Sequence, residues 1–128
     1  MERRADASDS PAVAYGHRRT GPFHLSGQID PVVVTMRFVA SDPSRVAAII
    51  SRYVVEARRS DGCINVDFCL SSGNSSVFVV ISKWASPTTQ RAHFDAPLTV
   101  EMAEALTGLL VSAPAIELLD PISAHDLR

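Results

Sequence analysis

Two side chains with the capacity for chemistry, Trp84 and His93, lie nine residues apart in the sequence. A histidine in a cavity can act as a general base near neutral pH, and His93 could take the proton of a phenol so that an electron-rich phenolate meets oxygen. The Trp84 ring could form a wall of that cavity, with its N–H holding a ligand oxygen. The alternatives are a core position for Trp84 and, for His93, a helix cap or a contact across a dimer.

Residues on the neighbouring predicted strands are candidates for contact with a ligand. Phe78 and Val80 share the predicted strand face of Trp84, because side chains alternate between the two faces of a strand. Asn65 could polarise a ligand, although a dimer contact or solvation at the sheet edge would explain it equally well. The substrate-binding residues predicted from the sequence are Phe68, Phe78, Val80 and Asn65.

The cysteine and histidine spacing does not indicate a metal site. The sequence has no HxxxH or CxxC motif, no cluster of carboxylates and no glycine-rich loop for a phosphate, so we predict no metal. Cys63 and Cys69 are predicted on one strand and on the same face as Asn65 and Asp67. Six strand residues span about 20 Å, so the two thiols cannot form a disulfide within the chain and are expected to be reduced.

Composition and charge exclude several classes of protein. The 128 residues are 46% hydrophobic and 20% charged, which is typical of one globular domain. A formal charge of −2 without a basic stripe argues against nucleic-acid binding. The sequence contains no apolar run near the roughly 20 residues of a membrane helix and no secretory leader, so we predict a cytoplasmic protein.

The order of predicted elements indicates an α+β fold. Residues 1–30 mix proline, glycine and charges without a period and are predicted to be a flexible tail, followed by one domain over 31–128. Strands are predicted at 32–40, 64–71, 77–84 and 115–119. Helices are predicted from 43 to about 60, from 87 to 95 and from 97 to 112. The order β-α-β-β-α-β is that of a ferredoxin-like domain.

Apolar residues occur on both faces of the predicted sheet. In the first predicted strand Val33 and Val39 alternate with the core-facing residues and so lie on the opposite face, yet they are apolar. Val79 and Ile81 in the third predicted strand are likewise apolar residues on that opposite face. A sheet open to water on one face would show polar residues there, and we expect this one to lack them. If these side chains stayed exposed to water, the fold would lose several kcal/mol of hydrophobic stabilisation, at about 25 cal/mol per Å² of apolar surface. The sequence therefore predicts a homodimer whose partner subunit covers the helix-free face.

Part of the sequence resembles a known family. The run Gly62-Cys63-Ile64, the strand Phe78–Trp84 and His93 nine residues after Trp84 resemble the antibiotic biosynthesis monooxygenase domain, over about residues 31–120. The resemblance implies a dimeric α+β barrel made of two ferredoxin-like sheets packed face to face. The family includes oxygenases that act on polycyclic phenols or quinols without metal or organic cofactor, haem-degrading enzymes, and members with no assigned activity.

The sequence departs from the family pattern at several positions. Ser82 stands where a glutamate is common, Val66 stands where a tyrosine is common, and the last helix lacks the histidine of the haem-degrading members. We therefore predict a cofactor-independent monooxygenase acting on an aromatic phenol or quinol, with His93 and Trp84 as catalytic residues. The alternatives are a non-catalytic homodimer that binds a small aromatic molecule or a protein, and an isomerase on the same scaffold.

Overall fold

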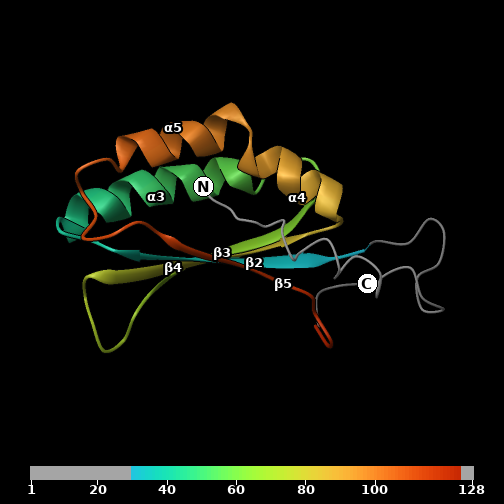
Figure 1. Ribbon diagram of the computed structural model, residues 1–128, viewed down its shortest axis with the longest axis horizontal. Helices are drawn as coiled ribbons and strands as arrows, with labels where there is room; N and C mark the ends of the chain where they lie inside the picture. Colours follow the sequence, from blue (N-terminus) through green and yellow to red (C-terminus); the bar gives the residue numbers. More distant parts are fainter. Residues whose placement is uncertain (1–29, 125–128) are drawn as a thin grey trace. The chain divides into compact units, whose positions relative to one another are not determined.

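The computed structural model describes residues 30–124, so the predicted tail lies outside the described residues except for Asp30. Within that range the chain folds as a ferredoxin-like α+β domain (Figure 1). Its elements, in chain order, are β2 (Val32–Val39), α3 (Pro43–Ala57), β3 (Cys63–Leu70), β4 (Val77–Trp84), α4 (Pro87–Phe94), α5 (Pro97–Ala105) and β5 (Ala115–Leu119).

The sheet of the described residues has the strand order β3-β4-β2-β5, and every neighbouring pair is antiparallel. The helices all lie on one face of this sheet (Figure 1). The predicted β-α-β-β-α-β order and fold class are therefore confirmed. No helix within residues 30–124 has the length and apolar character needed to cross a membrane.

The first helix begins where the sequence predicts it. Asp42 is the N-cap and its carboxylate accepts a hydrogen bond from the Arg45 backbone N–H, while Pro43 occupies the first helical position. One stripe of α3 is buried against the sheet and α5. The buried residues of that stripe are Val46, Ile50, Tyr53, Val54 and Ala57.

The last helix is shorter than predicted. The expected helix over 97–112 is wrong beyond Ala105, where the α-helix of the structure ends. Gly108 has a φ of 82°, a left-handed conformation that ends helices and that glycine adopts without strain. The chain then runs extended, and Leu110 forms a bridge with Ala40 at the end of β2.

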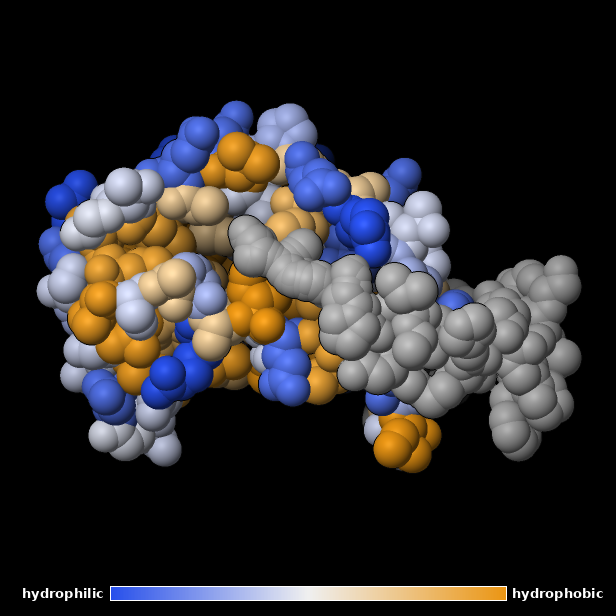
Figure 2. All heavy atoms as spheres, in the orientation of Figure 1, coloured by the Kyte–Doolittle hydropathy of each residue, from blue (hydrophilic) through white to orange (hydrophobic). Residues whose placement is uncertain are grey.

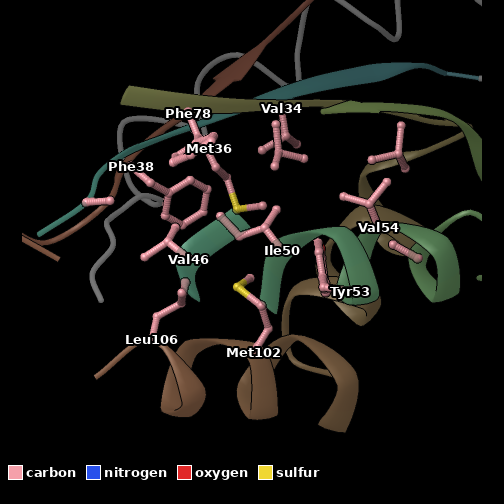
Figure 3. Packing of buried hydrophobic residues seen from close by; sticks show 14 of the residues in the cluster. Val34, Met36, Phe38, Val46, Ile50, Tyr53, Val54, Phe78, Met102 and Leu106 are labelled. Atoms are coloured by element: carbon pink, nitrogen blue, oxygen red, sulfur yellow. The ribbon is translucent and has the colours of Figure 1, made fainter. Parts of the chain in front are cut away.

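The core lies between the helices and one face of the sheet (Figure 3). The inward face of β2 agrees with the predicted alternation, because Val32, Val34, Met36 and Phe38 are all at most 6% exposed. In Figure 3 Val46 and Ile50 of α3 point toward Met36 and Phe38, while Met102 and Leu106 approach from the other side of α3. The sheet and the two longer helices thus share one continuous core.

The helix-free face of the sheet is more mixed than the sequence analysis expected. Val33, Val79 and Ile81 lie on this face and are half-buried. The expectation that the face lacks polar residues is wrong, because Arg37 and Asp67 lie beside those apolar residues and are exposed. The face is therefore an apolar centre with charged neighbours.

The edge strand β5 is exposed along its whole length. Ile116 is 38%, Leu118 52% and Leu119 38% exposed. Figure 2 shows other hydrophobic side chains reaching the surface below the polar outer side of the helices. The described domain thus leaves apolar surface uncovered on the sheet.

Gly62 is expected to be essential for the fold. Its φ is 75°, and a Cβ at this position would lie 2.5 Å from the side chain of Thr89. Gly62→Ala should lower the free energy of unfolding by about 2 kcal/mol or more, because backbone strain and a steric clash act together. Urea denaturation measures the change.

Two further glycines provide controls for that substitution. Gly108→Ala introduces the same strained φ with open space around the new Cβ, and should cost about 1 kcal/mol. Gly73→Ala meets neither a clash nor a positive φ and should change stability little. Equal losses in all three variants would contradict the assigned contact between Gly62 and Thr89.

Candidate functional site

A buried imidazole lies at the centre of the candidate site. His93, near the end of α4, is 8% exposed and both of its ring nitrogens have hydroxyl partners. Its Nε2 lies 2.6 Å from the Tyr53 hydroxyl on α3. Its Nδ1 lies 3.2 Å from the Ser60 hydroxyl, in the turn that follows α3. Three segments of the chain therefore meet at one ring.

Trp84, the last residue of β4, lies against this imidazole. The two ring centroids are 4.4 Å apart and the planes are tilted by 30°. The indole N–H donates a hydrogen bond of 2.9 Å to the Ser82 hydroxyl, and Trp84 is only 1% exposed. Trp84 and His93 thus do meet, while the indole N–H is bonded inside the chain.

Local sequence features fix the position of His93. The Ser86 and Thr89 side chains form a capping box at the start of α4, with Pro87 in the first turn. At the other end the Thr99 hydroxyl donates to the His93 carbonyl at 2.7 Å, which joins α5 to the end of α4. Side-chain hydrogen bonds at both ends of this short helix therefore fix the position of the His93 imidazole.

Burial shifts the proton affinity of each titratable group in the cluster. It lowers the pKa of His93 below its ordinary value of 6.5, so the ring is neutral at pH 7. Burial raises the pKa of Tyr53 to about 12; a hydrogen bond with Thr99 opposes this rise, and the nearby Cys63 adds to it. The Cys63 thiol also has a raised pKa, because burial outweighs the effect of Arg58.

The other predicted ligand contacts lie elsewhere on the sheet. Phe68, Phe78 and Val80 do face the helices. The ring centroids of Phe68 and Phe78 are 5.6 Å apart. Phe78 is six strand residues from Trp84, however, which is about 20 Å along β4. The structure therefore brings His93 and Trp84 together and leaves the phenylalanine pair at the other end of the strand.

Asn65 lies on the opposite, helix-free face of the sheet. Its amide donates to the Asp67 carboxylate at 3.3 Å. The expectation that Cys63 shares this face is wrong, because the register shifts between Cys63 and Asn65 and Cys63 packs against the core. Both cysteines are free thiols, as predicted.

The sequence analysis missed three hydroxyl residues of this cluster, which are Tyr53, Ser60 and Thr99. Tyr53 belongs to the buried stripe of α3 and was not predicted as a site residue. A signal was available, since a tyrosine in a buried stripe carries a hydroxyl that needs a partner. Ser60 and Thr99 gave no such signal, because serine and threonine at helix ends usually serve the backbone.

Among the described residues no group of three or more histidines, cysteines or carboxylates lies close enough to bind a metal ion. The cluster instead offers a neutral imidazole, the hydroxyls of Tyr53, Ser60 and Thr99, and an indole face. Such groups can accept or relay a proton from a hydroxylated molecule. The geometry therefore defines a ferredoxin-like domain with a buried cluster of an imidazole, an indole and hydroxyl groups between its sheet and helices.

Comparison with known proteins places this domain in a family. Residues 32–105 match the family described as antibiotic biosynthesis monooxygenase. Because the match spans more than half of the 128 residues, the chain belongs to the antibiotic biosynthesis monooxygenase family. No curated protein matches the sequence.

Solved structures share the fold at low identity. SnoaB, a cofactor-independent oxygenase from Streptomyces nogalater, is 19% identical with a TM-score of 0.67, over 74% of this chain and 96% of that chain. Rv0793 from Mycobacterium tuberculosis is 24% identical with a TM-score of 0.67, over 73% and 97%. PA3566 from Pseudomonas aeruginosa is 17% identical with a TM-score of 0.68, over 73% and 96%.

The lowered pKa of His93 predicts how stability depends on pH. The unfolded chain binds a proton at this residue below about pH 6.5, while the folded chain resists it. The free energy of unfolding should therefore fall as the pH drops below 6.5, by at most about 1.4 kcal/mol per pH unit from this one group. Denaturation with urea between pH 5 and 8 measures the slope.

The variant His93→Gln should flatten that slope, even if it lowers stability at every pH. Ser112→Ala, at an exposed position without a titratable group, is the control and should keep the slope of the natural chain. An unchanged slope in His93→Gln would contradict the assignment of the pH dependence to the buried imidazole.

Proposed function

We propose that this protein is a cofactor-independent monooxygenase that acts on an aromatic phenol or quinol. The observation that carries the proposal is the neutral, buried His93 imidazole stacked on Trp84, in a chain of this family. The structural relative SnoaB is itself a cofactor-independent oxygenase, which supports the same chemistry.

In the proposed reaction His93 is the general base. It takes the proton of the substrate hydroxyl, and the resulting phenolate gives electrons to O₂. One oxygen atom becomes the carbonyl of a quinone at a ring carbon that carried hydrogen, and the other leaves as water. The ring supplies all the electrons that reduce O₂, so the step needs no external reductant. Trp84 would provide the aromatic surface on which the substrate ring stacks.

The low pKa of His93 suits this role. A base must be unprotonated at working pH, and burial keeps the imidazole neutral near pH 7. The surrounding apolar residues also exclude water, which favours capture of O₂ by the phenolate over return of the proton. The chain's own residues thus supply the base, the aromatic wall and a dry environment.

Oxygen uptake with a panel of polycyclic phenols and quinols tests the proposal. We expect uptake above that of buffer, with a rate that falls as the pH drops through the His93 pKa, which lies below the ordinary value of 6.5. His93→Ala should lower the rate by about 10² or more, the usual contribution of a general base. Trp84→Phe should lower it less, because a ring remains for stacking.

Ser112→Ala, at an exposed position remote from the cluster in the sequence, is the control and should leave the rate unchanged. Absence of uptake with every compound, or uptake that the His93 and Trp84 substitutions do not alter, would reject the monooxygenase.

The proposal includes a homodimer formed through the helix-free face. The apolar centre at Val33, Val79 and Ile81 would be shielded by the same centre of a second chain. A partner would also cover Leu119 of β5, which is exposed and pairs with Val33. The mixed charges around the centre suit a face that pairs with a copy of itself, since Arg37 of one chain could meet Asp67 of the other.

Analytical ultracentrifugation of the full chain tests the dimer. We expect twice the mass of one chain at micromolar concentration, and dissociation on substitution Ile81→Lys, which puts a charge in the apolar centre. Val55→Lys, on the exposed side of α3, is the matched control and should stay dimeric. A natural chain that sediments as a monomer would exclude this interface.

One observation favours a second candidate function, a non-catalytic homodimer that binds a small aromatic molecule or a protein. Trp84 is almost fully buried and its N–H is bonded to Ser82, so the indole offers no free donor in this conformation. Thermal-shift measurements with aromatic compounds distinguish the two functions. Stabilisation without oxygen uptake would favour the binding protein, and conversion of a phenol without oxygen would favour the isomerase.

A further inference from the structure

Apart from tyrosine and tryptophan, four polar side chains of the described residues are buried, and all of them lie on β4, α4 or α5. They are Ser82, Gln90, His93 and Thr99, each at most 8% exposed. The Ser82 hydroxyl accepts the indole N–H of Trp84, and the Thr99 hydroxyl donates to the His93 carbonyl. The His93 imidazole meets two hydroxyls. Three of the four side chains are therefore bonded within the chain, and Gln90 remains.

The side-chain amide of Gln90 has no hydrogen bond to any group of residues 30–124. Its backbone N–H does form one, to the Ser86 carbonyl at 3.1 Å. The amide carries two N–H donors and an acceptor oxygen, and buried polar groups in folded proteins nearly always have partners. Proteins keep exceptions chiefly at functional sites. A buried amide that these residues leave unsatisfied can therefore serve a bound molecule.

Gln90 lies on the same face of α4 as His93. Both side chains are 8% exposed, whereas Arg91 and Ala92 between them are exposed. Residues three apart are neighbours on a helix surface, with Cβ atoms about 5–6 Å apart. The inner face of α4, which packs against β4 and α5, thus carries an amide one turn before the imidazole.

We propose that Gln90 is a substrate-binding residue, and that its amide holds a second oxygen of an aromatic molecule whose first oxygen is the hydroxyl at His93. The substrate class is then a ring system with two oxygen substituents rather than a simple phenol. The second oxygen can be a carbonyl, which accepts from the amide N–H, or a hydroxyl, which donates to the amide oxygen. The role in the reaction rests on the proposed monooxygenase, whereas the unsatisfied amide rests on the structure alone.

A second anchor has a consequence for the reaction. One hydrogen bond at His93 would leave the ring free to turn about that bond. A second bond at Gln90 would fix the orientation of the ring, and so select the ring carbon that meets O₂.

The variant Gln90→Met tests the unsatisfied amide without any ligand. Methionine is unbranched, as glutamine is, but has no strongly polar group that requires a partner. Because the amide is unbonded in the free protein, the melting temperature of this variant should be equal to or higher than that of the natural chain. A lower melting temperature would show that the amide bonds within the chain, and would overturn the proposal.

Isothermal titration calorimetry of the full chain under nitrogen tests the ligand class. The probes are α-naphthol and a dihydroxynaphthalene with one hydroxyl on each ring. We expect the natural chain to bind the dihydroxynaphthalene about tenfold more tightly, which is the usual contribution of one hydrogen bond. Gln90→Met should remove this preference and leave the binding of α-naphthol unchanged.

Arg91→Met, at the exposed neighbouring position, is the matched control and should keep the preference. Absence of binding, equal binding of the two probes by the natural chain, or a preference that survives in Gln90→Met would each overturn the proposal.

Oxygen uptake separates this inference from the proposed function. For a substrate with two oxygens, Gln90→Met should raise KM about tenfold and leave the pH profile unchanged, because His93 is still the base. A shifted pH profile would mean that Gln90 acts through His93 and not on the substrate. If no compound supports uptake, the proposed monooxygenase fails, while calorimetry still decides whether Gln90 binds the second oxygen.

Discussion

The hydrogen bond between Tyr53 and His93 is the interaction on which the rest of the site depends. It joins α3 to α4 across 40 residues of sequence, next to the apolar core. A buried polar group without a partner costs about 1–3 kcal/mol, so neither side chain would be tolerated there alone. Each of the two thus makes the burial of the other possible, and that burial keeps the imidazole neutral.

The remaining elements serve to place those two side chains. The turn after α3 must reverse sharply so that Ser60 reaches the ring, and Gly62 provides the left-handed residue this requires. The Gly62 carbonyl also accepts the backbone N–H of Ala85 at 2.8 Å, which joins that turn to the end of β4, next to Trp84. The loops that enter and leave the site are therefore connected through the backbone as well as through side chains.

Much of the fold could be predicted from the sequence, because period-two and helical patterns determine the elements and Asp42-Pro43 marks a helix start. The pair Trp84 and His93 was also predicted, from the chemistry of the two side chains and from the resemblance to the family. The register shift at Cys63 was not, since a bulge leaves no mark in an alternating pattern. Tyr53 was missed for a different reason: helical spacing shows which face a residue occupies, and only tertiary structure shows what its hydroxyl contacts.

The position of Trp84 has an optical consequence. It is the single tryptophan of the sequence, so the tryptophan fluorescence of the protein comes from the site alone. An indole that is 1% exposed emits at shorter wavelength than one in water, and a protonated imidazole 4.4 Å away is an efficient quencher of its emission. The brightness of the native protein thus reports directly on the charge carried by its neighbouring ring.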